Sequence, residues 1–160
     1  MRAREVTVED IPTVRGLLTA EAYHGHFAEL DTPDEIESFL QELVEHTSAL
    51  KAGRPALLHL QMLSVGDQTV GFVVLRGCVE PTELELHALV IAPDYRRHGY
   101  ARETLQDILT TLATSNRRLL ARCLPASIAM MALLNSMGFS HKSGIGMHVR
   151  HYLSPITRDA

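Results

Sequence analysis

Apolar and polar residues alternate along residues 83–88 and then give way to an apolar run at residues 89–91. The apolar residues of the alternating part are Leu84, Leu86 and Ala88. The titratable residues are Glu83, Glu85 and His87. Side chains alternate between the faces of a strand, so we expect these two sets on opposite faces. The pattern predicts a strand over residues 83–91 that enters a buried sheet and ends at Pro93.

Further strands are predicted where β-branched and apolar residues lie between turn signals. The runs 57–65 and 70–76 surround Gly66-Asp67-Gln68-Thr69, which is typical of a hairpin loop. The other predicted strands cover residues 6–8, 118–123, 138–142 and 147–153. We expect the last two to pair as a closing hairpin.

Two helices are predicted in the first third of the chain from capping signals and apolar spacing. The first follows Asp10, a candidate cap, and Pro12, which a first helical turn tolerates, and runs to about Ala22. The second opens with the capping box Thr32-Pro33-Asp34-Glu35 and runs to about Ala49.

A third helix is predicted to begin near Gly99, and a fourth covers residues 127–136. The third has apolar residues gathered on one face, namely Ala101, Leu105, Ile108, Leu109 and Leu112. The element order is therefore β-α-α-β-β-β-α-β-α-β-β. This order predicts an α/β fold with a mixed, mostly antiparallel sheet flanked by helices and one parallel crossover at the third helix.

The connection between the strand at 83–91 and the third helix favours an anion. The first turn of a helix has N–H groups without partners inside the helix, and the helix dipole adds positive charge there. Gly99 permits a close approach or a positive φ, and Ala101 adds little bulk. Arg96 and Arg97 supply positive charge. These features favour the pyrophosphate of a phosphorylated carrier.

The run Arg96-x-x-Gly99-x-Ala101, reached through Ile91-x-Pro93-x-Tyr95, resembles the acyl-CoA signature of the GNAT superfamily of N-acyltransferases. The resemblance implies a GNAT-like fold and acetyl-CoA as the cosubstrate. It implies diphosphate contacts from this loop and its amides, namely Arg96, Arg97, His98, Gly99, Tyr100 and Ala101. It also implies that backbone N–H groups orient the thioester at the end of the strand, at Leu89, Val90 and Ile91.

The second motif of the family, at residues 125–139, ends on Gly138-Phe139 as the resemblance implies. Ser127 stands where an asparagine is common, and we count it among the cofactor-binding residues. Leu134 stands where a tyrosine often serves as the general acid. A thiol has a pKa of about 8.5 and leaves tolerably as a thiolate, so water or Tyr152 remains as a proton donor. The alternative is a catalytically silent acyl-CoA-binding sensor or interaction protein.

An amine acceptor needs a base, because a lysine-like amine has a pKa of about 10.4 and is charged near neutral pH. Three titratable groups on one strand of a covered sheet suggest a cleft rather than a core. The resemblance implies an acidic base on this strand; Glu83 and Glu85 are the candidates, and His87 is a further proton acceptor. The alternative is that these groups top an open sheet edge or pair with an arginine.

The net charge of −4 hides two halves of opposite sign. Residues 1–86 hold 15 acidic and 6 basic residues, whereas residues 87–160 hold 4 acidic and 9 basic residues. A basic half suits a polyanionic cofactor, and an acidic half suits a cationic acceptor such as an amine, although a solvated helix face explains many of the carboxylates equally well. The overall acidity argues against nucleic acid as a partner. The identity of the amine, a small molecule or a protein amine, stays open.

At 160 residues the chain fits one acetyltransferase domain, residues 1–160. The sequence has no apolar run near the ~20 residues of a membrane span and no signal-peptide core, so we expect a cytoplasmic protein without a membrane partner. His24-x-His26 and His148-x-x-His151 lack a clear third ligand, so no metal is expected. The closing hairpin offers an edge strand, which makes a homodimer possible.

Overall fold

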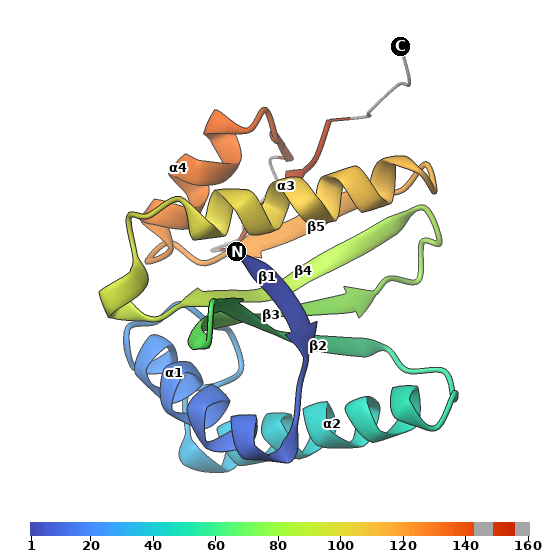
Figure 1. The fold of residues 1–160 in the computed structure, drawn as a ribbon. Coiled ribbons are helices and arrows are strands. Elements are labelled where there is room, and N and C mark those ends of the chain that lie inside the picture. The colour runs from blue at the N-terminus through green and yellow to red at the C-terminus, as the bar shows by residue number, and fades with distance from the viewer. Residues whose placement is uncertain (143–148, 156–160) are drawn as a thin grey trace.

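The computed structural model describes residues 1–142 and 149–155. Within these residues, seven strands form one sheet in the order β1-β2-β3-β4-β5-β7-β6 (Figure 1). The strands are β1 (Arg2–Glu5), β2 (Leu58–Val65), β3 (Gln68–Gly77), β4 (Glu83–Ile91), β5 (Arg118–Cys123), β6 (Ser140–Lys142) and β7 (Arg150–Leu153). Neighbouring strands are antiparallel except β4 and β5, which are parallel and joined through α3 (Tyr100–Ala113).

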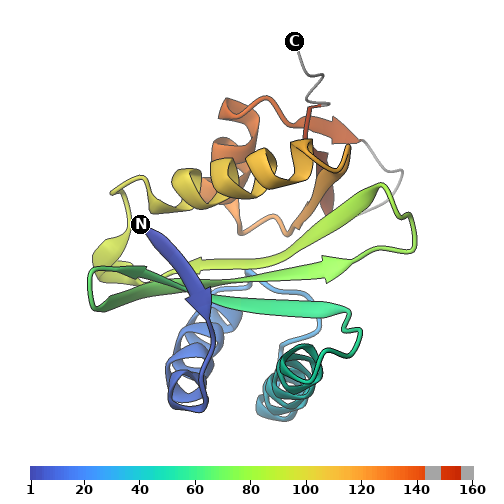
Figure 2. The same ribbon diagram turned by 45° about the vertical axis from the view of Figure 1, so that its right-hand side comes forward.

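Helices cover both faces of the sheet. α1 (Ile11–Tyr23) and α2 (Pro33–Lys51) lie on one face, and α3 and α4 (Ile128–Ser136) lie on the other (Figures 1 and 2). Short 3₁₀ turns, η1 (Val8–Asp10) and η2 (Pro93–Tyr95), precede α1 and α3. The predicted element order and the mixed, mostly antiparallel sheet between helices are confirmed. None of the described helices is both long enough and apolar enough to cross a bilayer.

The two faces of the sheet pack into separate apolar clusters, with β3 contributing to both. Phe72 packs with α1 and α2, whereas Val73 packs on the side of α3 and α4. Both side chains are at most 1% exposed. A central strand that is buried on both faces holds its neighbour β4 firmly, and β4 carries most of the candidate site.

The first strand differs from the prediction, because it covers Arg2–Glu5 rather than residues 6–8. The reason is Asp10, whose carboxylate accepts hydrogen bonds from the Thr7 N–H (2.8 Å) and from both terminal nitrogens of Arg4 (2.7 Å each). These bonds close a turn directly after Val6, so Val8 begins η1 and is 82% exposed. The Asp10 side chain therefore bonds to residues that precede it in the sequence and makes no capping hydrogen bond to α1.

The expected alternation along β4 is wrong at one position. Leu75 of β3 pairs with Leu86, but the next residue back, Val74, pairs with Ala88, so His87 is an extra residue in a β-bulge. The bulge reverses the faces on which the side chains after His87 lie. Leu84 and Leu86 pack with the α3–α4 cluster, whereas Ala88, expected on the same face, packs with the α1–α2 cluster on the opposite face.

The predicted capping box of α2 is confirmed: the Glu35 N–H donates to Thr32 Oγ1 (3.3 Å), and the Thr32 N–H donates to Glu35 Oε2 (2.9 Å). The closing hairpin is also present as the antiparallel pair β6 and β7. Met147 and His148, which were placed in the second of these strands, lie outside the described residues.

Candidate active site

β4 and β5 separate in the middle of β4. They pair only from Glu83 opposite Arg118 to Leu86 opposite Ala121. Among the described residues, β4 has no β5 partner from His87 onward, although β3 continues to pair on its other side. Backbone groups of Leu89, Val90 and Ile91 that point toward β5 are therefore left without a strand partner, as a ligand running beside β4 requires.

A glycine on β3 sets the position of this unpaired stretch. A Cβ atom on Gly71 would lie 2.0 Å from the carbonyl oxygen of Val90 and 3.1 Å from Cα of Ile91. Only a residue without a side chain allows β3 and β4 to approach this closely. Gly71 therefore supports the backbone at the end of β4 from behind.

The loop between β4 and α3 presents a row of backbone N–H groups. In the described part of the chain, the N–H groups of residues 97–102 have no hydrogen-bond partner, and the first helical bond is from the Glu103 N–H to the Gly99 carbonyl (3.0 Å). Gly99 has φ 85°, and a Cβ atom there would have nothing within 4 Å. Arg97 also has a positive φ, of 65°. Unpaired amides in an open turn before a helix form a typical anion site.

The two arginines of this loop lie in different surroundings. Arg96 donates through Nε to the Ile91 carbonyl (2.9 Å) and through Nη2 to the carboxylate of Glu21 on α1. Its charge is thus already paired, whereas Arg97 is exposed beside the free amides. The His98 ring stacks on Tyr100, with centroids 5.7 Å apart, and Ala101 is half-buried in the first turn of α3.

The three titratable residues of β4 do not share one environment. Glu85 is 6% exposed and its Oε1 accepts a hydrogen bond from Nε of Arg122 on β5 (3.0 Å), while Nδ1 of His87 lies 3.3 Å from the same oxygen. Burial raises the pKa of Glu85, but the hydrogen bonds from His87 and Arg122 lower it more and hold it at about 2. Glu83 is half-buried and is not part of this cluster.

Sequence reasoning missed Arg122, although a signal was present. Arg122 interrupts the apolar strand 118–123 beside a strand that carries carboxylates. The expected alternative, that a carboxylate of β4 pairs with an arginine, applies to Glu85 and leaves His87 with a free Nε2. The side chain of His87 is 26% exposed, so this nitrogen is within reach of a ligand.

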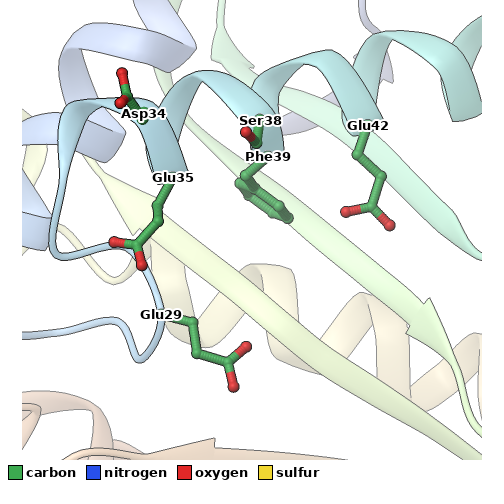
Figure 3. A pocket seen from close by; sticks show the side chains of 6 residues that line it. All are labelled: Glu29, Asp34, Glu35, Ser38, Phe39 and Glu42. Atoms are coloured by element: carbon green, nitrogen blue, oxygen red, sulfur yellow. The ribbon is translucent and has the colours of Figure 1, made fainter.

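A hollow of about 420 Å³ lies beside α2 (Figure 3). Its lining residues are Glu29, Asp34, Glu35, Ser38, Phe39 and Glu42. The Phe39 ring lies between the side chains of Glu35 and Glu42 in Figure 3, and its centroid is 5.4 Å from that of the His87 ring. Four carboxylates of the acidic half, those of Glu29, Asp34, Glu35 and Glu42, therefore line a hollow whose Phe39 ring lies near His87 of β4.

Two residues of the second motif lie at the start and on the buried side of α4. Ser127 is the N-cap residue of α4, and its carbonyl accepts the Met131 N–H (3.0 Å). Leu134 is fully buried in the α3–α4 cluster, and Tyr152 is only 2% exposed in the same cluster. Neither position thus offers a proton donor at the surface. His26 is bonded to Glu21, and the described residues contain no cluster of three metal-ligating side chains.

The sequence profile of the Acetyltransferase (GNAT) family matches residues 19–139, so the chain belongs to this family. A comparison with curated proteins finds no match.

Solved structures of acetyltransferases share the fold. The PaiA N-acetyltransferase of Thermoplasma acidophilum, in complex with coenzyme A, matches with a TM-score of 0.72 at 14% identity over 96% of this chain and 97% of the other. An acetyltransferase from Thermus thermophilus matches with a TM-score of 0.72 at 22% identity over 96% of both chains. YncA from Salmonella typhimurium, with acetyl-CoA, matches with a TM-score of 0.70 at 13% identity over 100% of this chain and 96% of the other.

Proposed function

We propose that this protein transfers an acetyl group from acetyl-CoA to a primary amine by direct attack on the thioester. The observation that carries the proposal is two groups of free backbone donors, one on each side of η2. The first lies on the β5 side of β4 at Leu89–Ile91, and the second consists of the unpaired amides of residues 97–102. A thioester carrier with a diphosphate matches these two groups of donors.

The loop before α3 fits the diphosphate of coenzyme A. Its amides have no competing partner among the described residues, and the open space around Gly99 leaves room for phosphate oxygens. Arg97 adds a positive charge that the protein does not already use in a hydrogen bond to a described residue. The structures of relatives with bound coenzyme A or acetyl-CoA support this choice of cosubstrate.

His87 is the general base in this proposal. With a pKa of about 2, Glu85 is too weak a base to take a proton from an ammonium group near neutral pH. The Glu85 carboxylate instead lies 3.3 Å from Nδ1 of His87, where it accepts a hydrogen bond from the tautomer that keeps its lone pair on Nε2. Arg122 holds Glu85 in place for this role.

The reaction then follows from this arrangement. Nε2 of His87 takes the proton of the amine, and the amine nitrogen attacks the thioester carbonyl carbon. The C–N bond forms, the C–S bond breaks, and its electron pair leaves with sulfur; the second proton of the attacking nitrogen passes through water to this sulfur. Free backbone N–H groups at the end of β4 stabilise the negative charge that develops on the carbonyl oxygen.

The acceptor is a cationic amine that enters through the acidic hollow. Carboxylates of Glu29 and Glu42 attract a charged group, and Phe39 adds an aromatic face beside His87. Several relatives are N-acetyltransferases by their descriptions, which supports a nitrogen acceptor.

A thiol-release assay with acetyl-CoA and a panel of diamines, amino sugars and lysine peptides tests the function. His87→Gln should lower kcat by about 10²–10⁴-fold while coenzyme A binding stays within about twofold. Absence of thiol release from the wild-type protein across the panel would contradict enzyme activity.

A catalytically silent acyl-CoA-binding sensor is the second candidate function. Leu134 favours it, because a fully buried leucine replaces the family's usual acid. Tight binding of acetyl-CoA in calorimetry without thiol release on the same panel would identify a sensor. In that case, His87→Gln would change neither measurement.

A further inference from the structure

Glu21 lies near the C-terminal end of α1 and contacts two loops at once. Its side chain is only 10% exposed although it is charged. Oε1 accepts a hydrogen bond from Nη2 of Arg96 in the loop before α3. Oε2 lies 2.9 Å from Nδ1 of His26, in the loop before α2. One buried carboxylate therefore joins segments that are 75 residues apart in the sequence.

Arg96 extends this connection to the sheet. Its Nε donates to the carbonyl of Ile91, the last residue of β4, at 2.9 Å. Its own N–H donates to the Pro93 carbonyl at 3.2 Å, which closes η2. Arg96 thus links α1 to the point where β4 ends and the amide-rich loop begins. The Arg96 guanidinium already bonds the Ile91 carbonyl and the Glu21 carboxylate, and Glu21 neutralises its charge. It is therefore a poor partner for a diphosphate.

Stability alone does not explain a carboxylate at this place. Glu21 shares α1 with the fully buried Val14 and Leu18. The Glu21–Arg96 pair is only half-buried, with the Arg96 side chain 43% exposed, and such a pair contributes little to the free energy of unfolding. The two oxygens of Glu21 instead fix the position of one side chain on each loop, Arg96 and His26.

We propose that Glu21 is a positioning residue that clamps the diphosphate-binding loop through Arg96 and couples this loop to the acceptor side through His26. The inference rests on the proposed function, because it assigns the loop to coenzyme A. His26 precedes Glu29, which lines the acidic hollow. Order in one loop is therefore transmitted to the other through a single side chain.

The test compares the wild-type chain with Glu21→Gln. Glu37→Gln is the matched control, because it breaks the exposed Arg15–Glu37 ion pair between α1 and α2. Amide hydrogen exchange without ligand comes first. Glu21→Gln should speed exchange at the Tyr95 and Arg96 N–H groups, which bond Ala92 and Pro93, by about tenfold, and the control should not. Unchanged exchange in Glu21→Gln would overturn the clamp.

Calorimetry with coenzyme A gives a second readout, and the direction of the change in affinity decides between two explanations. The clamp predicts about tenfold weaker binding for Glu21→Gln. If Arg96 binds the diphosphate itself, the loss of the Glu21 charge frees a cation, and binding stays equal or tightens, which would overturn the proposal. A wild-type chain that binds no coenzyme A would overturn the proposed function, while the exchange readout still decides the clamp.

Coupling is tested at His26, whose N–H donates to the Glu21 carbonyl (3.2 Å). Coenzyme A should slow exchange of this N–H in the wild-type protein and not in Glu21→Gln; equal behaviour in both would overturn the coupling. If Glu21→Gln does not fold, Arg96→Lys replaces it. Lysine keeps the charge but cannot bond Ile91 and Glu21 together, so faster exchange of the Tyr95 N–H without ligand supports the clamp and unchanged exchange overturns it.

Discussion

Glu85 and His87 lie on the same face of β4, with Glu85 Oε1 3.3 Å from His87 Nδ1. Residues two apart share a face in any regular strand, and the bulge at His87 turns the strand over directly afterwards. The pair therefore stands at the last position where β5 still runs beside β4, which is why Arg122 reaches Glu85. A base at this point faces the place where the two strands part.

Replacing Arg122 by Gln should shift acid unfolding. Burial raises the pKa of Glu85, and after the substitution only His87 opposes it, so the pKa rises from about 2. A carboxyl with a lowered pKa stabilises the fold above its ordinary value of 4.5 and loses that contribution as the pH falls toward about 2. The variant should therefore lose stability at higher pH than the wild-type protein.

The loss at pH 5 should be about 1–2 kcal/mol, below the cost of breaking a fully buried pair, because the Arg122 side chain is 42% exposed. Urea unfolding from pH 2 to pH 6 measures it. Arg15→Gln, which breaks an exposed pair, should leave the acid profile nearly unchanged. Identical profiles for both variants would contradict the role of Arg122.

Gly71→Ala should disturb the site from behind the sheet. The new Cβ would lie 2.0 Å from the Val90 carbonyl, so β3 or β4 must move, at a cost of about 2 kcal/mol or more in the free energy of unfolding. Gly16→Ala is the control, because Gly16 is in α1 with nothing within 4 Å of a Cβ and should gain about 0.5–1 kcal/mol. Thermal unfolding with coenzyme A calorimetry tests both; a Gly71→Ala protein with wild-type stability and affinity would disprove the close contact.

Local patterns were sufficient for most of the fold. The strands 83–91 and 118–123 have the predicted bounds, because periods of two residues and the flanking Pro93 act within a few residues. The start of α3 at Gly99 and the capping box of α2 follow in the same way from neighbouring residues. The first strand was misplaced because the Asp10 turn depends on Arg4, which apolar periodicity does not report.

Long-range pairing limited the prediction of the site. The bulge at His87 is a mismatch of register with β3, so no pattern within β4 reveals it. Glu21 and Arg96 are far apart in sequence, and the assignment of Arg96 to the diphosphate could not include a partner on α1. The hollow beside Phe39 likewise depends on how α2 packs over β4. The loop amides were predictable because they follow from the start of a helix alone.

Arg97→Gln should weaken coenzyme A binding without loss of stability. Arg97 is exposed next to the unpaired amides, and one charge-assisted contact corresponds to about tenfold in Kd. The effect should shrink as salt rises, because exposed charges are screened. Arg54→Gln removes the same charge from an exposed position after α2 and is the control. Calorimetry at two salt concentrations measures the difference; equal affinities for the two variants would exclude Arg97 from the diphosphate site.

Glu29→Gly should separate stability from acceptor binding. Glu29 has φ 63°, a conformation that costs a residue with a Cβ atom about 1 kcal/mol and costs glycine little. Glycine should therefore keep or raise the free energy of unfolding. The Glu29 carboxylate, however, lines the acidic hollow beside Phe39. Loss of this carboxylate should raise KM for a cationic amine by about tenfold while KM for acetyl-CoA is unchanged.

Asn116→Gly is the matched control, because Asn116 also has a positive φ, of 51°, in the turn between α3 and β5. Asparagine tolerates this conformation better than glutamate, so its stability gain should be smaller, and both KM values should stay at the wild-type level. Urea unfolding and initial rates over a range of amine concentrations measure the two effects. A Glu29→Gly enzyme with wild-type KM for the amine would show that a strained glutamate is held in the hollow for a purpose other than acceptor binding, and the cationic acceptor would lose its main support.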